Sequence, residues 1–250
     1  MQTLNRPVQD QLSRFKSRVD DLIANHPIVT NNAFTSWFAQ GKATDQELRD
    51  FTVQFSVFSH LFIEAQLRKC INAVDLQSYR ASKEILMNEL GVGFTRAGSI
   101  DNGRFKFDAA HFEWLLQFAE AQCLSFGEIG KRRHGSATTL AFCDALMEWY
   151  GAECESTQAG ASHAIENWAA AGFWKELIAG LQIIKQDRMP DLPLAFWVFH
   201  DQIEDQHAAH TDDELEAAFA KPDFDEEAFI AGSKAMLDAV SVFWNGLRKS

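Results

Sequence analysis

Apolar residues recur along most of this chain at intervals of three and four positions, and strict alternation of polar and apolar residues is hard to find. The first spacing is typical of amphipathic helices and the second of half-buried strands. Only five prolines and fourteen glycines interrupt the pattern, so few helix breakers are available. The pattern predicts helices at residues 7–25, 28–40, 44–74, 77–91, 108–124, 136–151, 154–170, 172–187, 192–210 and 224–248.

Local signals mark some of the helix ends. Thr44 is followed by Glu47 at the spacing of a capping box, which predicts that a helix begins there. Gly91 and Gly93 are expected to end the fourth helix. The segment 92–107 is rich in Gly, Ser, Asn and Asp and is expected to be a long loop, either a lid or a surface insertion. No internal repeat or linker is evident, so we expect one all-α bundle over residues 1–250.

Composition narrows the possible functions. The chain has 250 residues, of which 46% are hydrophobic, enough for a substantial core. Its net charge of −12, with no basic stripe, argues against nucleic acid or an anionic membrane as a partner. The first residues lack the apolar core of a signal peptide, and no apolar run is long enough to span a bilayer. We therefore expect a cytoplasmic protein that acts on a small molecule. Apolar faces near both ends leave a homodimer open.

Three polar residues near position 200 fall on one side of a predicted helix. With about 100° per residue, Glu204 and His207 lie within about 40° of His200. Phe196, Trp197 and Ile203 share that side, which predicts that the stripe faces the core. Buried ionisable groups are costly unless they are paired or bound to a metal. His-x3-Glu-x2-His therefore predicts metal ligands. The alternative is that both histidines are ordinary core or surface residues.

Two further acids lie on apolar helix faces. Glu64 has Val57, Leu61, Leu67 and Ile71 as helical neighbours, which predicts a buried carboxylate. Its alternative role is an ion pair with Arg68. Glu166 is surrounded by small residues that leave room beside its carboxylate, and His163 lies one turn earlier. The phenylalanine stripe of the same helix as Glu64 is expected to be core packing; it consists of Phe51, Phe55, Phe58 and Phe62.

A third region combines an acid at a helix end with a histidine at the start of the next helix. Glu89 closes the fourth predicted helix, in the stretch NELG, and His111 stands in the first turn of the next one. Asp108 precedes His111 by three residues and is the alternative to Glu89 as a ligand. The other role open to Asp108 is that of a helix cap, for which Asp is favoured.

Taken together, these residues resemble a known family. The order Glu64, Glu89 in ELG, His111, Glu166 in AIE and His200-x3-Glu204-x2-His207 is similar to that of the heme-oxygenase-like diiron oxidases and oxygenases, within the TenA/PqqC-like helical superfamily. The resemblance covers about residues 45–210. It differs in two places: the family commonly has Asp where Glu204 stands, and its members keep the acid and the histidine closer than Glu89 and His111 are here.

The resemblance implies both a fold and an activity. The implied fold is a bundle of about seven core helices with flanking helices, and the implied cofactor is a pair of Fe(II) ions, without heme, that uses O2 as co-substrate. The implied ligands are Glu64, Glu89, His111, Glu166, His200, Glu204 and His207. Family members oxidise small substrates that bear a carboxylate or an amine, by carbon–carbon cleavage or desaturation of fatty acids or amino acids, or by N-oxygenation. Arg68 and His163 are candidate substrate-binding residues.

Two other functional classes stay open. One is the metal-independent branch of the same helical fold, the TenA-like aminopyrimidine hydrolases, which use a nucleophilic cysteine; Cys143 or Cys154 would have to serve. The four cysteines show no C-x-x-C spacing, however, and are expected to be buried thiols. The other class is a non-catalytic binding protein that uses the bundle as a scaffold. Neither class would require His200, Glu204 and His207 on one helix face.

Overall fold

The computed structural model describes the backbone of residues 6–93, 104–105 and 107–247. Side chains are described over the same ranges except at 6–7, 93, 104–107 and 203–210. The helices are α1 (Arg6–Ala24), α2 (Pro27–Thr30), α3 (Ala33–Phe38), α4 (Asp45–Ile71), α5 (Leu76–Glu89), α6 (His111–Glu120), α7 (Ala137–Ala145), α8 (Glu155–Ala170), α9 (Phe173–Asp187), α10 (Ala195–Phe219) and α11 (Glu226–Gly246). Short 3-10 turns at Phe107–Ala109 and Arg132–His134 and a π-helical turn at Leu146–Tyr150 complete the helical structure.

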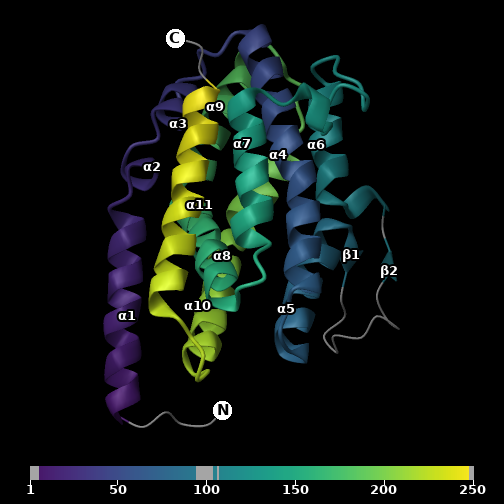
Figure 1. The fold of residues 1–250 in the computed structure, drawn as a ribbon. Helices are drawn as coiled ribbons and strands as arrows, with labels where there is room; N and C mark the ends of the chain where they lie inside the picture. Colours follow the sequence, from purple (N-terminus) through teal and green to yellow (C-terminus); the bar gives the residue numbers. More distant parts are fainter. Residues whose placement is uncertain (1–5, 94–103, 106, 248–250) are drawn as a thin grey trace.

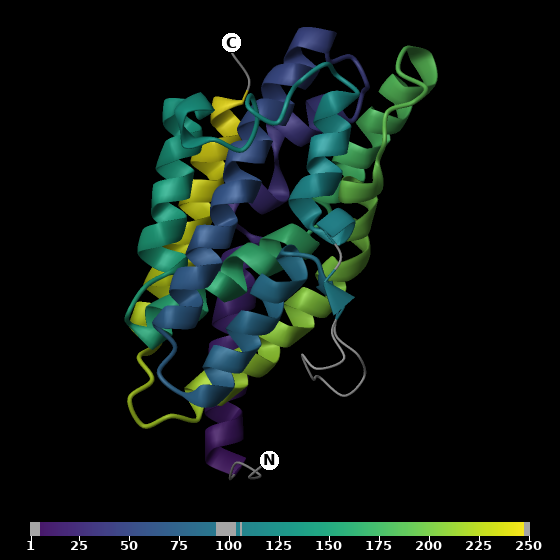
Figure 2. The same ribbon diagram turned by 90° about the vertical axis from the view of Figure 1, so that its right-hand side faces the viewer.

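The helices form the all-α bundle that the periodicity predicted. Helix α8 runs through the interior, where it packs against α10 on one side and α11 on the other (Figure 1). Helix α4 packs along α5, and α11 also contacts α7. Helix α1 lies at the outer edge, against α11. A view turned by 90° shows α9 and α10 along the side of the bundle opposite α7 and α11 (Figure 2).

Capping explains where several helices begin. Thr44 and Glu47 form the predicted capping box at the start of α4, with the Thr44 backbone N–H donating to Glu47 Oε2 at 2.7 Å. Asn32 interrupts the helix expected at 28–40, because its Oδ1 accepts hydrogen bonds from the backbone N–H groups of Phe34 and Thr35 and so starts a new helix, α3. Helix α10 continues to Phe219, beyond the expected end at 210, since no glycine or proline intervenes.

The segment expected to be a loop at 92–107 contains a small strand pair. β1 (Val92–Gly93) and β2 (Arg104–Phe105) are antiparallel, with Val92 opposite Phe105. Residues 94–103 and 106, which make up most of the segment expected to be a lid or a surface insertion, lie outside the described residues. The pairing brings the end of α5 back toward the start of α6.

The core is unusually rich in aromatic rings. Phe51 and Phe55 of α4 are almost completely buried, and both contact Trp197 of α10. Phe58 and Phe62 are partly buried and pack against the same core, so the predicted packing role of the phenylalanine stripe is confirmed. Helices α8 and α11 approach closely, because Gly160 faces the Phe229 carbonyl with no space for a Cβ atom.

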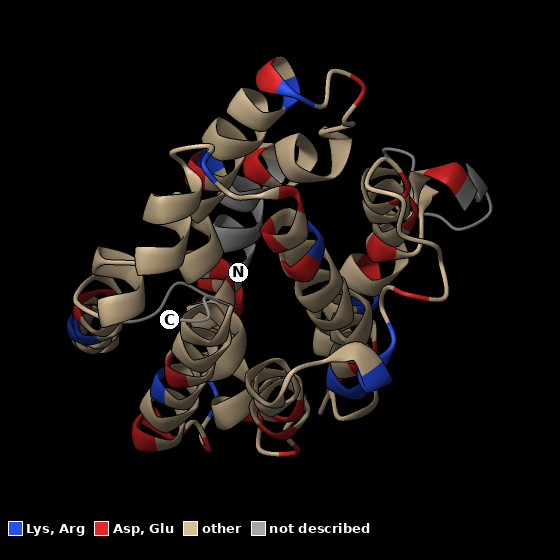
Figure 3. Ribbon diagram, turned by 90° about the horizontal axis from the view of Figure 1, so that it is seen from above, with Lys and Arg blue, Asp and Glu red and all other residues tan. Residues whose placement is uncertain are grey.

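Acidic residues outnumber basic ones, giving the net charge of −12, and Figure 3 shows the acidic positions distributed over the bundle. None of the described helices combines the length and the hydrophobicity that crossing a bilayer requires. All four cysteines are free. Cys70 and Cys143 are buried as expected, whereas Cys123 and Cys154 are exposed. For the last two, the expectation of a buried thiol is wrong, because both precede or follow helices in surface turns.

Candidate metal centre

Three of the residues singled out in the sequence meet in the interior of the bundle. Glu89 comes from the end of α5, His111 from the start of α6 and His200 from the second turn of α10. One ligand atom from each lies within 4.8 Å of the other two. A carboxylate and two imidazoles at this separation are suitable ligands for a first-row transition metal.

The contact between Glu89 and His111 has the form expected of two ligands of one ion. His111 Nδ1 lies 2.9 Å from Glu89 Oε2, and the imidazole is only 2% exposed. The same nitrogen has no hydrogen-bond partner among the described residues, so the two atoms are close without being aligned for a hydrogen bond. Two donors bound at right angles to one ion, each at about 2.1 Å, would be about 3 Å apart. The residues present therefore fit a metal ion.

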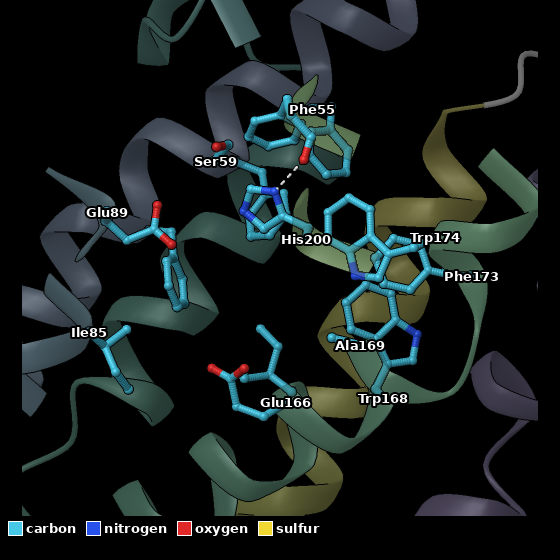
Figure 4. A pocket seen from close by; sticks show the side chains of 14 residues that line it. Phe55, Ser59, Ile85, Glu89, Glu166, Trp168, Ala169, Phe173, Trp174 and His200 are labelled. Carbon is cyan, nitrogen blue, oxygen red and sulfur yellow. Dashed lines mark hydrogen bonds between the residues drawn. The ribbon is translucent and has the colours of Figure 1, made fainter. Parts of the chain in front are cut away.

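His200 is oriented by its own helix. Its Nδ1 lies 2.7 Å from the Phe196 carbonyl oxygen, which can only accept, so Nδ1 carries the proton and donates it (Figure 4). Nε2 is then left with its lone pair, as a metal-bound imidazole requires. The Trp174 ring stacks on this imidazole at 5.0 Å between ring centroids. The His111 and His200 rings are 4.9 Å apart and nearly perpendicular.

A cavity of about 80 Å³ adjoins these ligands. Glu89, Glu166 and His200 line it, and the carboxylate of Glu166 faces it from α8 (Figure 4). Glu166 is 7% exposed, so its predicted burial is confirmed. The other walls are largely aromatic and aliphatic; they include Phe55, Phe58, Phe62, Ile85, Trp168, Phe173, Trp174 and Phe196. Such walls exclude water and strengthen electrostatic interactions within the cavity.

Helix α4 contributes different residues from the one predicted. Glu64 is exposed, with 54% of its side chain accessible, and lies 3.5 Å from Arg68 Nη2. The expectation that Glu64 is buried is wrong, because Leu67 and Ile71, two of the apolar neighbours that suggested it, are themselves 47% and 71% exposed. This face of α4 is apolar, but no other helix covers Leu67 and Ile71 in the described part of the chain. Ser59 and Phe62 face the cavity from α4 instead.

Of the two alternatives Glu89 and Asp108, the structure places Glu89 beside His111. Asp108 is exposed, in a 3-10 turn, and it is the backbone carbonyl of Asp108 that accepts a hydrogen bond from Trp114 Nε1 at 2.8 Å. Asp108 is not the cap of α6 either, since Ala110 takes that position without a side-chain hydrogen bond. Glu204 and His207 belong to α10, but their side chains lie outside the described residues.

The two candidate substrate-binding residues have other partners. Arg68 is half exposed and paired with Glu64. His163 is buried, and its Nε2 lies 3.1 Å from Asp212 Oδ1, on the side of α8 that faces α1 and α10. Burial lowers the pKa of His163. Neither side chain lines the cavity.

A buried polar cluster lies one turn from Glu166 on α8. The Lys69 ammonium, only 4% exposed, donates to Ser162 Oγ at 2.8 Å and pairs with Glu214 Oε2 at 3.1 Å. The Tyr150 hydroxyl donates to Gln66 Oε1. Burial raises the pKa of Tyr150 well above its ordinary value, and the negative charge of Glu166 raises it further. The phenol is therefore a neutral donor close to the cavity.

Several residues that shape the cavity were not found from the sequence. Trp168, Phe173 and Trp174 surround the turn between α8 and α9, where Gly172 takes a positive φ of 103°. The stretch AAAGFW marks the turn, but periodicity gives no indication that its aromatic rings would meet the His200 ring. That contact depends on how α9 packs against α10, which only the three-dimensional arrangement shows.

Comparison with known proteins gives the fold. No family model and no curated protein matches this chain. Among solved structures, the chain is similar to a CADD-like protein of unknown function from Nostoc punctiforme, with 18% identity, a TM-score of 0.69 and coverage of 95% of this chain and 97% of that one. A domain of unknown function with a heme oxygenase-like fold from Shewanella denitrificans has 14% identity, a TM-score of 0.61 and coverage of 96% and 91%.

A third similar structure is a TenA homolog from Pseudomonas syringae pv. tomato, with 9% identity, a TM-score of 0.65 and coverage of 96% of this chain and 92% of that one. At such identities the likeness carries no activity from one protein to another. It extends nearly from end to end of each pair, so it covers the helices that carry Glu89, His111, Glu166 and His200. The chain therefore has the heme-oxygenase-like helical fold.

Proposed function

We propose that this protein is a non-heme diiron oxidoreductase that uses O2 to oxidise a small substrate bearing a carboxylate or an amine. The observation that carries the proposal is the group Glu89, His111 and His200, in which a buried imidazole nitrogen lies 2.9 Å from a carboxylate oxygen without a hydrogen bond. The resemblance of the ligand order to the diiron oxidases supports iron as the metal.

The ligand set that we propose is narrower than the one the resemblance implies. Glu89, His111 and His200 would hold one ion, and Glu166 would hold a second together with residues of α10. Glu64 is left out because its side chain is exposed. The complete proposed set is Glu89, His111, Glu166, His200, Glu204 and His207. Hard carboxylate oxygens suit the oxidised metal, and imidazole suits both oxidation states. When bound, two Fe(II) ions supply the electrons that reduce O2.

The protein supplies orientation and a dry cavity. The Phe196 carbonyl fixes the His200 tautomer, so Nε2 is the ring nitrogen that can bind a metal. The Trp174 ring limits rotation of the same imidazole. Aromatic walls keep water from a reactive centre, which favours attack on the substrate over loss of the oxidant to solvent.

The metal-independent hydrolase is less well supported. A cysteine nucleophile must be a thiolate, but burial raises the pKa of Cys143 to about 12. Cys154 is exposed at the start of α8, and neither cysteine lines the cavity. In a non-catalytic scaffold, the close contact of His111 with Glu89 would have only the structural role of an ion pair.

Anaerobic loading with Fe(II), followed by metal counting and exposure to O2, tests the proposal. We expect two ions per chain in the wild-type protein and O2 consumption after loading. His111→Ala and His200→Ala should each reduce iron binding, while His134→Ala, which changes a partly exposed histidine that does not line the cavity, should not. A wild-type protein that binds no ferrous ion, or variants that bind as much as wild type, would contradict the proposal.

A further inference from the structure

A second cavity lies against the first. Its volume is about 170 Å³, and it is bordered by α3, the turn before it and the start of α9. Trp168 and Phe173 line both cavities. Their rings stack at 4.4 Å between centroids with only 8° between their planes. The stacked pair therefore borders both cavities, and the Glu166 carboxylate lines the first of them.

The second cavity differs from the first in its chemistry, because polar groups line much of it. Glu176 of α9 accepts a hydrogen bond from the Thr35 hydroxyl at Oε2 and another from the Ser36 hydroxyl at Oε1, the latter at 3.1 Å. Both hydroxyls and Glu176 border the cavity. Within the described part of the chain, no Lys or Arg is paired with this carboxylate at ion-pair distance.

Hydrogen-bonding capacity remains on both sides of this cavity. A carboxylate offers about four lone-pair sites, and the two hydroxyls occupy one on each oxygen of Glu176. Asn32, only 8% exposed, uses its Oδ1 to cap α3, while its Nδ2 has no hydrogen-bond partner among the described residues. The site therefore presents a negative charge with free acceptor sites next to an unused amide donor. A protonated amine matches the first of these features, since an ammonium group has three donors and a positive charge.

We propose that this second cavity binds the ammonium group of a small primary amine, and that the apolar body of the same molecule lies along the Trp168–Phe173 rings toward Glu166. This inference rests on the proposed function and narrows it, because it selects the amine from the two substrate classes left open. The Glu176 carboxylate pairs with the ammonium group, and the aromatic rings contact the carbon skeleton. Glu176 is a specificity-determining residue and holds no metal.

The test uses metal-free protein, so that its failure is distinguishable from a failure to bind iron. The probes are 2-phenylethylamine and 3-phenylpropionate, which share an aromatic body and have opposite charges. Binding is followed by tryptophan fluorescence, since Trp168 lines both cavities, and by calorimetry. We expect the amine to bind the wild-type protein and the carboxylate to bind at least tenfold more weakly.

Variants test the role of the carboxylate. Glu176→Gln keeps a side-chain oxygen for the hydroxyls and removes the charge, and it should weaken amine binding roughly tenfold to a hundredfold, as loss of a charge-assisted hydrogen bond does. Glu120→Gln makes the same change of charge on the exposed end of α6 and should leave binding unchanged. Unchanged amine affinity in Glu176→Gln, carboxylate binding as tight as amine binding, or no amine binding at all would each overturn the inference. The comparison of the two probes needs no variant, so it stands even if Glu176→Gln does not fold.

Discussion

Oε2 of Glu89 and Nδ1 of His111 lie 2.9 Å apart, although one residue closes α5 and the other opens α6. The chain between them is long, and that length made Asp108 a competing candidate. The β1–β2 pair explains the proximity, because antiparallel pairing of Val92 with Phe105 returns the chain to where it left α5. Two residues far apart in sequence are thus brought close enough to bind one ion.

Separate substitutions of Glu89 and Asp108 test which of these two acids is a metal ligand. Glu89→Gln should lower Fe(II) affinity by at least the tenfold to hundredfold that loss of a partner supporting a metal ligand costs, since a neutral amide is a poorer ligand for a hard cation than a carboxylate. Asp108→Asn should bind iron like the wild type. Metal content after equilibrium dialysis at several iron concentrations measures both. A strong effect of Asp108→Asn would show that the wrong acid was chosen.

Glu64 provides a second discriminating variant. Because its carboxylate is exposed and paired with Arg68, Glu64→Gln should leave iron content and O2 consumption unchanged and alter the unfolding free energy by less than about 1 kcal/mol, as for other surface ion pairs. Loss of one iron per chain in this variant would mean that α4 supplies a ligand after all.

How far the sequence predicts this molecule depends on whether a feature is local. The capping box at Thr44, the length of most helices and the burial of Glu166 follow from neighbouring residues. The exposure of Glu64 does not follow from its neighbours, since an apolar helix face shows which side could be covered and not whether another helix covers it. Asn32 splits a predicted helix because a side chain competes locally for backbone N–H groups. The Trp168–Phe173 wall depends on the packing of α9, which periodicity does not contain.

Asp75 should give the protein a pH-dependent contribution to stability. A hydrogen bond from the Lys221 ammonium and another from the Ser78 backbone lower the pKa of Asp75 from 3.8 to about 2. A depressed carboxylate pKa stabilises the fold above the ordinary value, and this contribution is lost as the pH falls toward 2. Asp75→Asn keeps a cap for α5 and removes the charge.

We therefore expect Asp75→Asn to be less stable than the wild type at neutral pH by about 1 kcal/mol or less, given the exposure of the pair. The difference should shrink as the pH is lowered below about 4. Urea unfolding at a series of pH values measures it. A difference that widens on acidification would contradict the assigned ion pair.

The close approach of α8 and α11 predicts a destabilising substitution. A Cβ atom at Gly160 would collide with the Phe229 backbone carbonyl, which cannot move as a side chain can. Gly160→Ala should lower the free energy of unfolding by roughly 1–3 kcal/mol, even though alanine favours helix formation. Gly127→Ala is the matched control, because only Ser125 Oγ, at 3.8 Å, lies near its Cβ position. Equal unfolding midpoints for the two variants would refute the packing argument.

The cysteines should differ in reactivity. Burial raises the pKa of Cys143 to about 12, and burial also raises the pKa of Cys70. Because alkylation requires the thiolate, iodoacetamide near pH 8 should modify Cys123 and Cys154 in the native protein and the other two only after denaturation. Peptide mass spectrometry identifies the modified residues. Rapid labelling of Cys143 in the native protein would contradict this prediction and would support the alternative in which Cys143 is the nucleophile of a metal-independent hydrolase.

The ligands proposed for the two metal ions come from α5, α6, α8 and α10, so the ions would act as cross-links between parts of the chain that meet only in the folded bundle. The complete ligand set would exist only once α10 has docked against the other helices. Each cation taken up would also shift the folding equilibrium by mass action, by about 2.7 kcal/mol at a free concentration one hundred times the dissociation constant. Substitutions that loosen the docking of α8 and α10 would consequently weaken iron retention without touching a single ligand, and cellular iron supply would influence how long the protein survives.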